Sequence, residues 1–335
     1  MPPRPAVRLA DVAAASGVSI TTVSHVVNGT RFVAPDTRAR VERALSDLKY
    51  VSPVTSRPEA GASTIGLAIT GSSNPYFGEL IQGVESELSR SGRALLLCDS
   101  HDDPGREAQA VSTLLAHNVD AIIMAPSTRW KTDTLPLLRR HATPFVLVDR
   151  LSEARCDQVG VENELASAKL VEHLLDHGHT RVGMIAGLGG LSTTVERVDG
   201  FRRAHAASGV PLDEALVVSG HSTTSGGRSA VHQLMNSANP PTAIFSANNA
   251  MTIGALLAFR ELGRTVPDDL ALVVFDDFDW AGAVTPALTA VAQPFHAVGA
   301  YAVHLLARRL ADPTAPRKVV RLPAEIHHRE SCGCS

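Results

Sequence analysis

The sequence predicts an α/β protein in which a small all-α N-terminal unit precedes a larger body of two lobes with parallel sheets. The first 50 residues carry apolar positions at helical spacing. From Ser63 onward, short apolar runs alternate with amphipathic stretches of helical length, which is typical of parallel α/β layers. Eight such runs are many for one open sheet, so we expect two sheets.

The N-terminal unit predicts three helices. The first covers residues 9–16 and ends at Gly17. Ser19 is a suitable N-cap for the second, which Asn28-Gly29 ends, and Pro35 fits the first turn of the third. Two short helices separated by a glycine turn and braced by a third form a helix-turn-helix, which we expect over residues 1–50.

Residues 51–62 are rich in Pro, Ser and Ala, which predicts a linker. The expected strands of the body are the apolar runs TIGLAIT, RALLLCDS, VDAIIMAP, PFVLVDR, RVGMIAG, ALVVSG, TAIFSAN and LALVVFDD. Among the expected helices are residues 76–91, 164–177, 194–208 and 251–262.

Composition and charge narrow the class of protein. Of 335 residues, 44% are hydrophobic and 19% are charged, as in soluble globular proteins. There is no apolar run of about 18 residues and no secretory signal pattern, so we expect a cytoplasmic protein without a membrane span. The net charge is −3, but residues 1–60 carry eight basic and five acidic side chains. The basic end is therefore the part suited to phosphate.

The cysteines and histidines give weaker signals. Cys98, Cys156, Cys332 and Cys334 show no disulfide framework, so we expect reduced thiols, the last two in a C-terminal tail. A metal site joining that tail to His327 and His328 is an alternative, as is zinc at His173 and His177; a solvated helix end is favoured for the latter pair. The loop Gly187–Gly190 lacks the spacing of a nucleotide cradle, so neither metal nor cofactor is expected.

The second helix carries the candidate DNA contacts. Short hydroxyl side chains allow a helix to approach the major groove closely, and an imidazole can donate to a guanine acceptor. The alternative is that these residues only cap and solvate a small helix. The candidates are Ser19, Ile20, Thr21, Thr22, Ser24, His25 and Asn28, with Arg57 in the linker.

The residues 8–50, RLADVAAASGVSITTVSHVVNGTRFVAPDTRARVERALSDLKY, resemble the head of the lactose/galactose-repressor family, and TTVSHVVNGTRFVA is similar to its purine-repressor subgroup. The body carries further family motifs in the same order: NPYF at 74–77, VDR at 148–150, ERVDGFRRA at 196–204, residues 241–277 and TPALTAVAQP at 285–294. The resemblance therefore covers nearly the whole chain.

The resemblance implies a homodimer that binds double-stranded DNA at a pseudo-palindromic operator, with Ile20, Thr21 and His25 reading bases. It also implies a body like type I periplasmic binding proteins, with lobes at 63–161 plus 293–322 and at 162–292 plus 323–335. The linker departs from the family pattern. Glu59 stands where a leucine wedge is usual and Pro58 disfavours helix at Arg57, which puts the DNA kink in doubt.

Polar side chains follow the expected strands of the body, where ligands bind in α/β sheets. Asp149, Asn248 and Asp276 stand at such strand ends, Trp280 comes shortly after Asp276, and Arg197 follows the loop that begins at Gly187. The resemblance implies that Asn74 and Phe77 face the cleft from the first lobe, and these seven residues are the candidate ligand contacts. Asp149 and Asp276 could instead cap turns, Arg197 could pair with Asp199, and Trp280 could be core. By the resemblance, Leu191 and Ser222 replace a donor and a stacking ring of the purine subgroup, which favours a sugar-like effector over a nucleobase or nucleoside.

These observations predict a transcription repressor whose DNA affinity responds to a small molecule. A sugar-binding transport receptor is a second class, but the N-terminal unit and the missing export signal count against it. An enzyme is a third class, and the sequence offers no recognisable nucleophile, metal set or cofactor loop for one.

Overall fold

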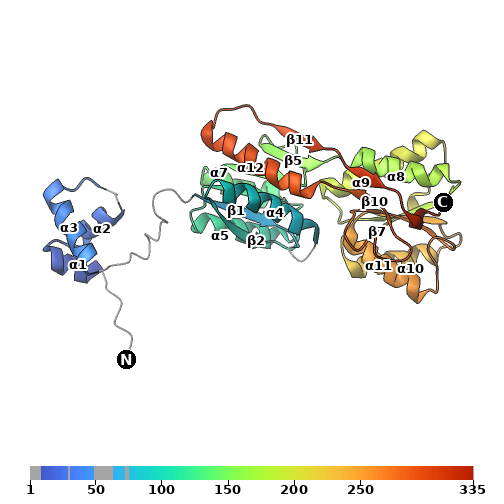
Figure 1. The fold of residues 1–335 in the computed structure, drawn as a ribbon, viewed down its shortest axis with the longest axis horizontal. Helices are drawn as coiled ribbons and strands as arrows, with labels where there is room; N and C mark the ends of the chain where they lie inside the picture. Colours follow the sequence, from blue (N-terminus) through green and yellow to red (C-terminus); the bar gives the residue numbers. More distant parts are fainter. Residues whose placement is uncertain (1–8, 29–30, 49–62, 72–74, 335) are drawn as a thin grey trace, which may run out of the picture. The chain divides into compact units, whose positions relative to one another are not determined.

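The structure, a computed structural model, describes residues 9–28, 31–48, 63–71 and 75–334. The chain divides into two compact units, residues 1–62 and 63–335 (Figure 1). Two predicted site residues, Arg57 and Asn74, lie outside the described residues, as do the linker 51–62 and the side chain of Asn28.

The N-terminal unit contains the three predicted helices: α1 (Leu9–Ser16), α2 (Ile20–Asn28) and α3 (Pro35–Asp47). Their buried side chains form one core around Val12, Val23 and Val41, each with no exposed surface. The axes of α1 and α2 meet at 105°, the angle of a helix-turn-helix. Among the described residues no single helix is long and apolar enough to cross a membrane; only this bent pair, taken together, reaches that length and composition.

The body contains two six-stranded sheets with equivalent strand orders. The first sheet runs β11 (Val319–Leu322), β5 (Asp157–Val161), β4 (Phe145–Val148), β3 (Ala121–Met124), β1 (Thr64–Ile69), β2 (Ala94–Asp99). The second runs β12 (Glu325–His327), β10 (Thr289–Ala292), β9 (Ala271–Phe275), β8 (Ala243–Ser246), β6 (Val182–Ala186), β7 (Val217–Ser219). All neighbours are parallel except β10 and β12. We call each sheet with its covering helices the first and the second lobe.

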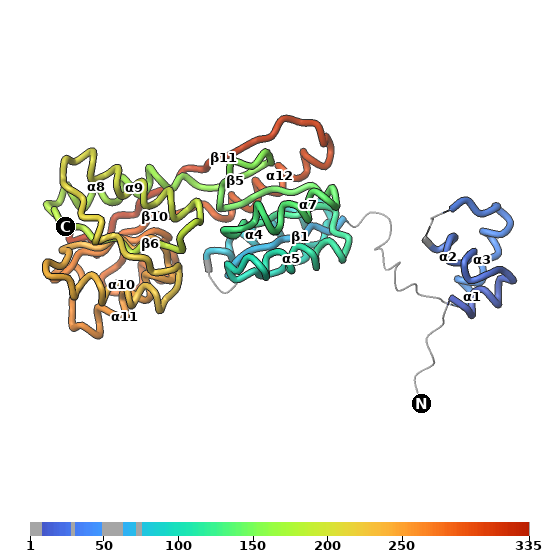
Figure 2. The backbone as a smooth tube through the Cα atoms, turned by 180° about the vertical axis from the view of Figure 1, so that it is seen from behind, coloured from blue at the N-terminus to red at the C-terminus, as the bar shows by residue number. Residues whose placement is uncertain are grey.

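Helices cover both faces of each sheet (Figures 1 and 2). In the first lobe, α4 (Pro75–Arg90) and α12 (Phe295–Ala311) pack on one face, and α5 (Pro104–Ala116), α6 (Trp130–Asp133) and α7 (Leu135–Arg140) on the other. In the second lobe, α8 (Glu164–Asp176) pairs with α9 (Ser192–Ser208), and α10 (Thr224–Met235) with α11 (Asn249–Glu261). Two 3₁₀ turns, η1 (Glu214–Leu216) and η2 (Glu330–Cys332), complete it.

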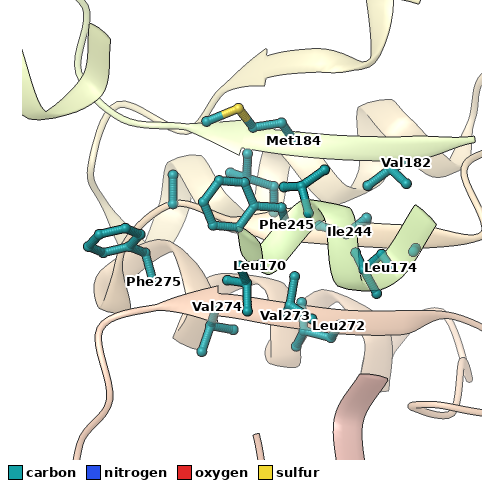
Figure 3. Close-up of a cluster of buried hydrophobic side chains, with 14 of the residues drawn as sticks. Leu170, Leu174, Val182, Met184, Ile244, Phe245, Leu272, Val273, Val274 and Phe275 are labelled. Carbon is teal, nitrogen blue, oxygen red and sulfur yellow. The ribbon is translucent and has the colours of Figure 1, made fainter. Parts of the chain in front are cut away.

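The strands are apolar on both faces because both faces are covered. In the second lobe, Leu170 and Leu174 of α8 pack on Phe245 and Val273 of the central strands, all fully buried (Figure 3). The chain passes between the two sheets three times, after β5, after β10 and after β11. The carboxyl ends of the parallel strands therefore flank the passage between the lobes.

All eight expected strands are present, and the four named helices of the body differ from prediction by one or two residues at their ends. Four further strands among the described residues, β5, β10, β11 and β12, lie outside those eight apolar runs. Strand β5, DQVGV, reads as polar, but Asp157 and Gln158 are buried and hydrogen-bonded, the first by Arg309 and the second to the backbone of Ser152 and Ala154.

The expectation of a loose, reduced C-terminal tail is wrong. Cys332 is 2% exposed and belongs to the core of the second lobe, and it forms a disulfide with Cys334. The segment is held because Ser331 bonds to both neighbouring strands: its hydroxyl donates to Leu272 O and accepts from Thr289 N, at 2.6 and 2.8 Å. These two hydrogen bonds and the burial of Cys332 tie the end of the chain to the second lobe.

Candidate functional site

The face of α2 that points away from the head core carries the residues predicted to contact DNA. Val23 and Val26 are buried, whereas Ile20 is 53% exposed and Thr21 is also exposed. Thr22, Ser24 and His25 are half-buried. The helix therefore presents one apolar and several short polar side chains outward, which suits close approach to a groove.

Local contacts fix where α2 begins. The hydroxyl of Ser19 accepts a hydrogen bond from the backbone N–H of Thr22 at 3.1 Å, which confirms the predicted N-cap. The Arg40 guanidinium of α3 donates to the carbonyl oxygens of Ser16 and Gly17 at 3.0 and 3.3 Å. Gly17 has φ +67°, a left-handed conformation that suits glycine in this turn. The turn between the two helices is thus fastened to the bracing helix.

A cavity of about 240 Å³ lies between the two lobes at the carboxyl ends of the strands. Of the seven predicted ligand contacts, five line it: Phe77, Asp149, Arg197, Asn248 and Asp276. The first lobe also contributes Thr70, Gly71, Tyr76, Asp102 and Arg150, and the second contributes Gly187, Leu191, Thr193, Thr194, Ser222, Ala247 and Ala250. The cavity wall is therefore rich in charged and hydroxyl groups.

Asp149 follows β4 in a left-handed conformation, φ +65°, and its side chain is buried. The Tyr76 hydroxyl donates a short hydrogen bond to its Oδ1, and Arg150 Nε lies 3.5 Å from Oδ2. Burial raises the pKa of the Asp149 carboxyl, and the charge of Arg150 opposes that rise. Burial, with the charge of Asp149, also raises the pKa of Tyr76 well above its usual value. The tyrosine therefore remains a hydrogen-bond donor.

Arg197 of α9 is a buried, rigidly held guanidinium. Its Nε donates to Asn163 Oδ1 at 2.9 Å, its Nη1 donates to the Ala247 carbonyl at 2.6 Å, and its plane lies 3.7 Å from the ring centre of Phe275. The alternative pairing with Asp199 does not occur, since Asp199 faces Arg202 at 3.6 Å. Arg197 therefore presents a fixed positive edge to the cavity.

Asp276 follows β9 with φ +81° and is 4% exposed. Its Oδ2 accepts from the backbone N–H of Asn249 at 3.1 Å, and its Oδ1 accepts from Gln293 Nε2. Asn248 caps α11 because its Oδ1 accepts from Met251 N at 2.9 Å. Burial raises the pKa of Asp276, and the Arg197 charge lowers it. Within the described part of the chain, Asp276 therefore bonds to the first turn of α11 and not to the turn that follows it, and both Asp276 and Asn248 line the cavity.

Trp280 is outside the set of described residues that line the cavity. It lies in the turn after β9, half-buried, with its ring stacked on Phe278 at 5.1 Å between centroids. The structure therefore places it as a packing residue, because four residues separate it from the strand end. Among lining residues, Asp102 and Arg150 were not predicted; both follow apolar runs, the signal that identified Asp149.

Two of the segments that cross between the lobes bond directly to cavity residues, and the third is joined to them through Glu196. Asn163, after β5, accepts from Arg197 and donates to Glu196 Oε2 at 3.0 Å. Arg321, at the end of β11, donates to both Glu196 oxygens at 2.7 and 3.1 Å. Gln293, after β10, donates to Asp276. All three crossings are therefore mechanically joined to the wall of the cavity.

A second cavity of about 490 Å³ adjoins the first and shares Arg150 and Leu191 with it. Trp130, Lys131 and Arg321 also line it. The two shared side chains separate the spaces, so their size decides how far a ligand extends.

Residues 8–52 match the family model of bacterial regulatory proteins of the lacI family, and residues 171–332 match that of a periplasmic binding protein-like domain. The chain is 33% identical over 325 residues to the HTH-type transcriptional repressor PurR of Photobacterium profundum, covering 96% of this chain and 97% of that protein. It is 32% identical over 325 residues to the ribose operon repressor of Escherichia coli, covering 96% and 98%.

Solved structures agree. A complex of the transcriptional regulator CelR with cellobiose has a TM-score of 0.73 at 31% identity, covering 98% of this chain and 100% of that one. The lac repressor dimer bound to operator and the anti-inducer ONPF has a TM-score of 0.72 at 25% identity, covering 98% and 99%. The chain therefore belongs to the LacI family of bacterial regulatory proteins, in which a DNA-binding head is joined to a ligand-binding body.

Proposed function

We propose that this repressor binds a polyhydroxylated, sugar-like effector between its lobes and that the effector sets its operator affinity. The observation that carries the proposal is the convergence of Asp149, Arg197 and Asp276 on one cavity. Two carboxylates and a fixed guanidinium supply both acceptors and donors, the combination that vicinal hydroxyls need. Asn248 adds an amide, and Phe77 an apolar surface. Asn74 is proposed as a further contact from its place in the sequence.

The choice of a sugar over a nucleobase rests on the cavity wall. Leu191 and Ser222 line it, and neither offers a charged fork or an aromatic plane to a purine. Two similar solved structures hold sugars: CelR is solved with cellobiose and an Enterococcus faecium regulator with ribose. A nucleobase or nucleoside effector is the second candidate, favoured by Tyr76 and Phe77 at the rim.

For DNA, the proposal assigns base contacts to Ile20, Thr21 and His25. Ser19, Thr22, Ser24, Asn28 and Arg57 are assigned contacts to the same groove or to phosphate. A homodimer with one head on each half of a pseudo-palindromic duplex is part of the proposal. So are a cytoplasmic location, the absence of catalysis, and lobe boundaries at 63–161 with 293–322 and 162–292 with 323–335.

Effector and operator are coupled through the crossings. A ligand that pulls on Arg197 and Asp276 also pulls on Asn163 and Gln293, which lie where the chain passes between lobes. The angle between the lobes then differs between the effector-free and the effector-bound protein. Such a difference is the condition for linkage between effector binding and operator affinity.

The DNA proposal is tested by selecting duplexes from a random pool with the full chain and footprinting the winners. Thr21→Ala and His25→Ala should each lower the affinity for the selected duplex by about tenfold or more, with loss of protection at the base pairs that these side chains contact. Ala39→Ser, on the exposed face of α3, is the control and should bind normally. Equal footprints for all four proteins would remove α2 from base recognition.

The effector proposal is tested by calorimetry against pentoses, hexoses, disaccharides, nucleobases and nucleosides. A sugar should bind, and Asp149→Asn or Asp276→Asn should each weaken it by about tenfold or more, since a neutral amide is a poorer acceptor. Asp268→Asn, on an exposed side chain that lines neither cavity, is the control. Binding of a nucleobase in place of any sugar would establish the second candidate.

A further inference from the structure

We propose that His173, His177 and Cys334 form a binding site for a divalent cation of the zinc class on the second lobe, distinct from the cavity between the lobes. The two histidines were expected to be a solvated helix end and the cysteine part of a loose tail. The structure brings them together, with one ligand atom of each residue within 4.8 Å of the others. The C-terminal end lies beside α8 in both views of the body (Figures 1 and 2).

The spacing and chemistry of the cluster suit a cation site with nitrogen and sulfur ligands. His173 and His177 are one helical turn apart on α8, so their rings project from the same face. His173 Nε2 lies 3.0 Å from Cys334 Sγ. Imidazole nitrogen and thiolate sulfur are ligands that zinc prefers.

The second histidine is already oriented as a ligand. Its Nδ1 lies 2.7 Å from the carbonyl oxygen of His173, which accepts that N–H. The lone pair of His177 is then on Nε2, and the ring cannot turn without losing the bond. A hydrogen bond from the other ring nitrogen to a carbonyl is the usual support of a metal-binding histidine.

A fourth ligand is available from the segment that precedes the cysteine. The ring of His328 lies 4.4 Å from that of His173, centre to centre, and its side chain is exposed. Its neighbour His327 is engaged elsewhere, with Nδ1 2.6 Å from Asp277 Oδ2. The site can therefore be completed by His328 or by water.

The oxidation state of Cys334 controls this site, because its sulfur is shared with Cys332. A dithiol or phosphine reductant supplies the two electrons that break the sulfur–sulfur bond, and each sulfur takes up one proton. A dithiol gives up its own two thiol protons and becomes a disulfide. With a phosphine, one water molecule provides both protons and its oxygen becomes the phosphine oxide. Binding of the cation then releases the proton of the Cys334 thiol.

Cys332 has a separate place after reduction. Its Sγ lies 3.2 Å from the Arg329 carbonyl and 3.3 Å from Thr289 Oγ1, inside the core. It therefore stays buried as a thiol while Cys334 turns to the metal. Removing Cys332 should leave Cys334 permanently available.

The test is titration of untagged, full-length protein with ZnCl₂ and, for spectroscopy, CoCl₂. Protein reduced with a trialkylphosphine should bind one ion per chain and show thiolate-to-cobalt absorption, and oxidised protein should do neither. His177→Ala and Cys334→Ser, both at the surface or half-buried, should weaken binding by about a hundredfold. Cys332→Ala should bind without any reductant.

His141→Ala is the matched control, since it removes an exposed histidine from the first lobe and should bind like the wild type. Circular dichroism checks that each variant is folded. The proposal is overturned if reduced protein takes up no stoichiometric ion, or if Cys334→Ser still gives the thiolate band. Equal binding by oxidised and reduced protein would overturn the redox control. The outcome is independent of DNA or effector binding.

Discussion

At the scale of single residues, left-handed backbone gathers at the cavity between the lobes. Non-glycine residues rarely adopt positive φ, and each such residue costs about 1 kcal/mol or more. Six of the described non-glycine residues with positive φ stand at equivalent places in the two lobes. His101 and Asp102 after β2 correspond to His221 and Ser222 after β7, and Asp149 after β4 corresponds to Asp276 after β9. Short polar side chains tolerate this conformation best, and they are the groups a ligand site requires.

On α2, exposure separates residues for recognition from residues for stability. Ile20→Ala removes a side chain that is 53% exposed, so the free energy of unfolding should change by less than about 0.5 kcal/mol. Operator affinity should fall. Val23→Ala, at a site with no exposed surface, should cost about 1–2 kcal/mol. Urea denaturation and gel shifts on both variants check this; a large stability loss for Ile20→Ala would show that its side chain is structural.

Asp157 gives the first lobe a pH-dependent stability. Burial raises the pKa of its carboxyl, but hydrogen bonds from Arg309 and Lys318 N, with the charges of Arg309 and Arg308, outweigh burial and hold the pKa below 3.8. Because the pKa of Asp157 is lower in the folded than in the unfolded protein, its ionised carboxylate stabilises the folded state above pH 3.8. This contribution disappears as the pH falls through the pKa of the folded protein. Asp157→Asn should therefore cost about 3 kcal/mol at neutral pH and progressively less in acid.

The measurement for Asp157 uses the two tryptophans, one in each lobe. In a Trp280→Phe background, Trp130 fluorescence reports urea unfolding of the first lobe. Glu153→Gln, whose carboxylate is 98% exposed, is the control and should shift stability little at any pH. An Asp157→Asn penalty that stays constant into acid would contradict the ion-pair account.

At the scale of elements, glycines set the distance between paired helices. A Cβ built on Gly83 of α4 would lie 2.1 Å from the His296 carbonyl oxygen, and one on Gly299 of α12 would lie 2.3 Å from Leu80 O. In the second lobe, Gly200 of α9 has the same relation to Glu164 O, at 2.3 Å. The helix backbones touch at these points, so the glycines are required by packing.

Two glycines of α4 provide a matched test. Gly83→Ala should destabilise the protein by about 2 kcal/mol, since the clash outweighs the gain in helix propensity of about 1 kcal/mol. Gly78→Ala has no atom within 4 Å of the added Cβ and should stabilise by about 0.5–1 kcal/mol. Thermal and urea unfolding measure both. Equal changes in the free energy of unfolding for the two substitutions would mean that helix propensity alone, and not the clash at Gly83, determines the effect.

The elements also show what the sequence could predict. Strands with uninterrupted apolar runs, such as TAIFSAN, were found because both faces are buried. Strand β5 was missed because one of its buried polar residues, Asp157, is held by Arg309, 152 positions away. Asp149 and Asp276 were predicted as cavity residues because they follow strands. Trp280 was predicted on the same ground, but its ring stacks on Phe278 and it is not among the described residues that line the cavity. The cluster of His173, His177 and Cys334 joins α8 to the C-terminal end, a contact that no local sequence pattern encodes.

At the scale of the whole body, the three crossings decide whether the lobes respond to a ligand together. Asn163 and Gln293 bind the cavity residues Arg197 and Asp276 directly. Arg321 reaches the same network through Glu196; it lines the larger cavity, and it is not among the described residues that line the smaller one. Arg321 is therefore the place where coupling can be altered without removing a group from the wall of the smaller cavity.

Arg321→Met should reduce the effect of effector on operator affinity by about fivefold, because Glu196 and Asn163 lose their tie to β11. Effector affinity of the DNA-free protein should change little. Stability should change by less than about 1 kcal/mol, since the guanidinium is 40% exposed. Arg202→Met is the control, because Arg202 lies on α9, the helix that carries Glu196, but pairs with Glu214 inside one lobe. Operator titrations with and without effector measure the coupling in each variant. Equal coupling in wild type and Arg321→Met would place the transmission in the other two crossings, where Gln293→Leu becomes the decisive substitution.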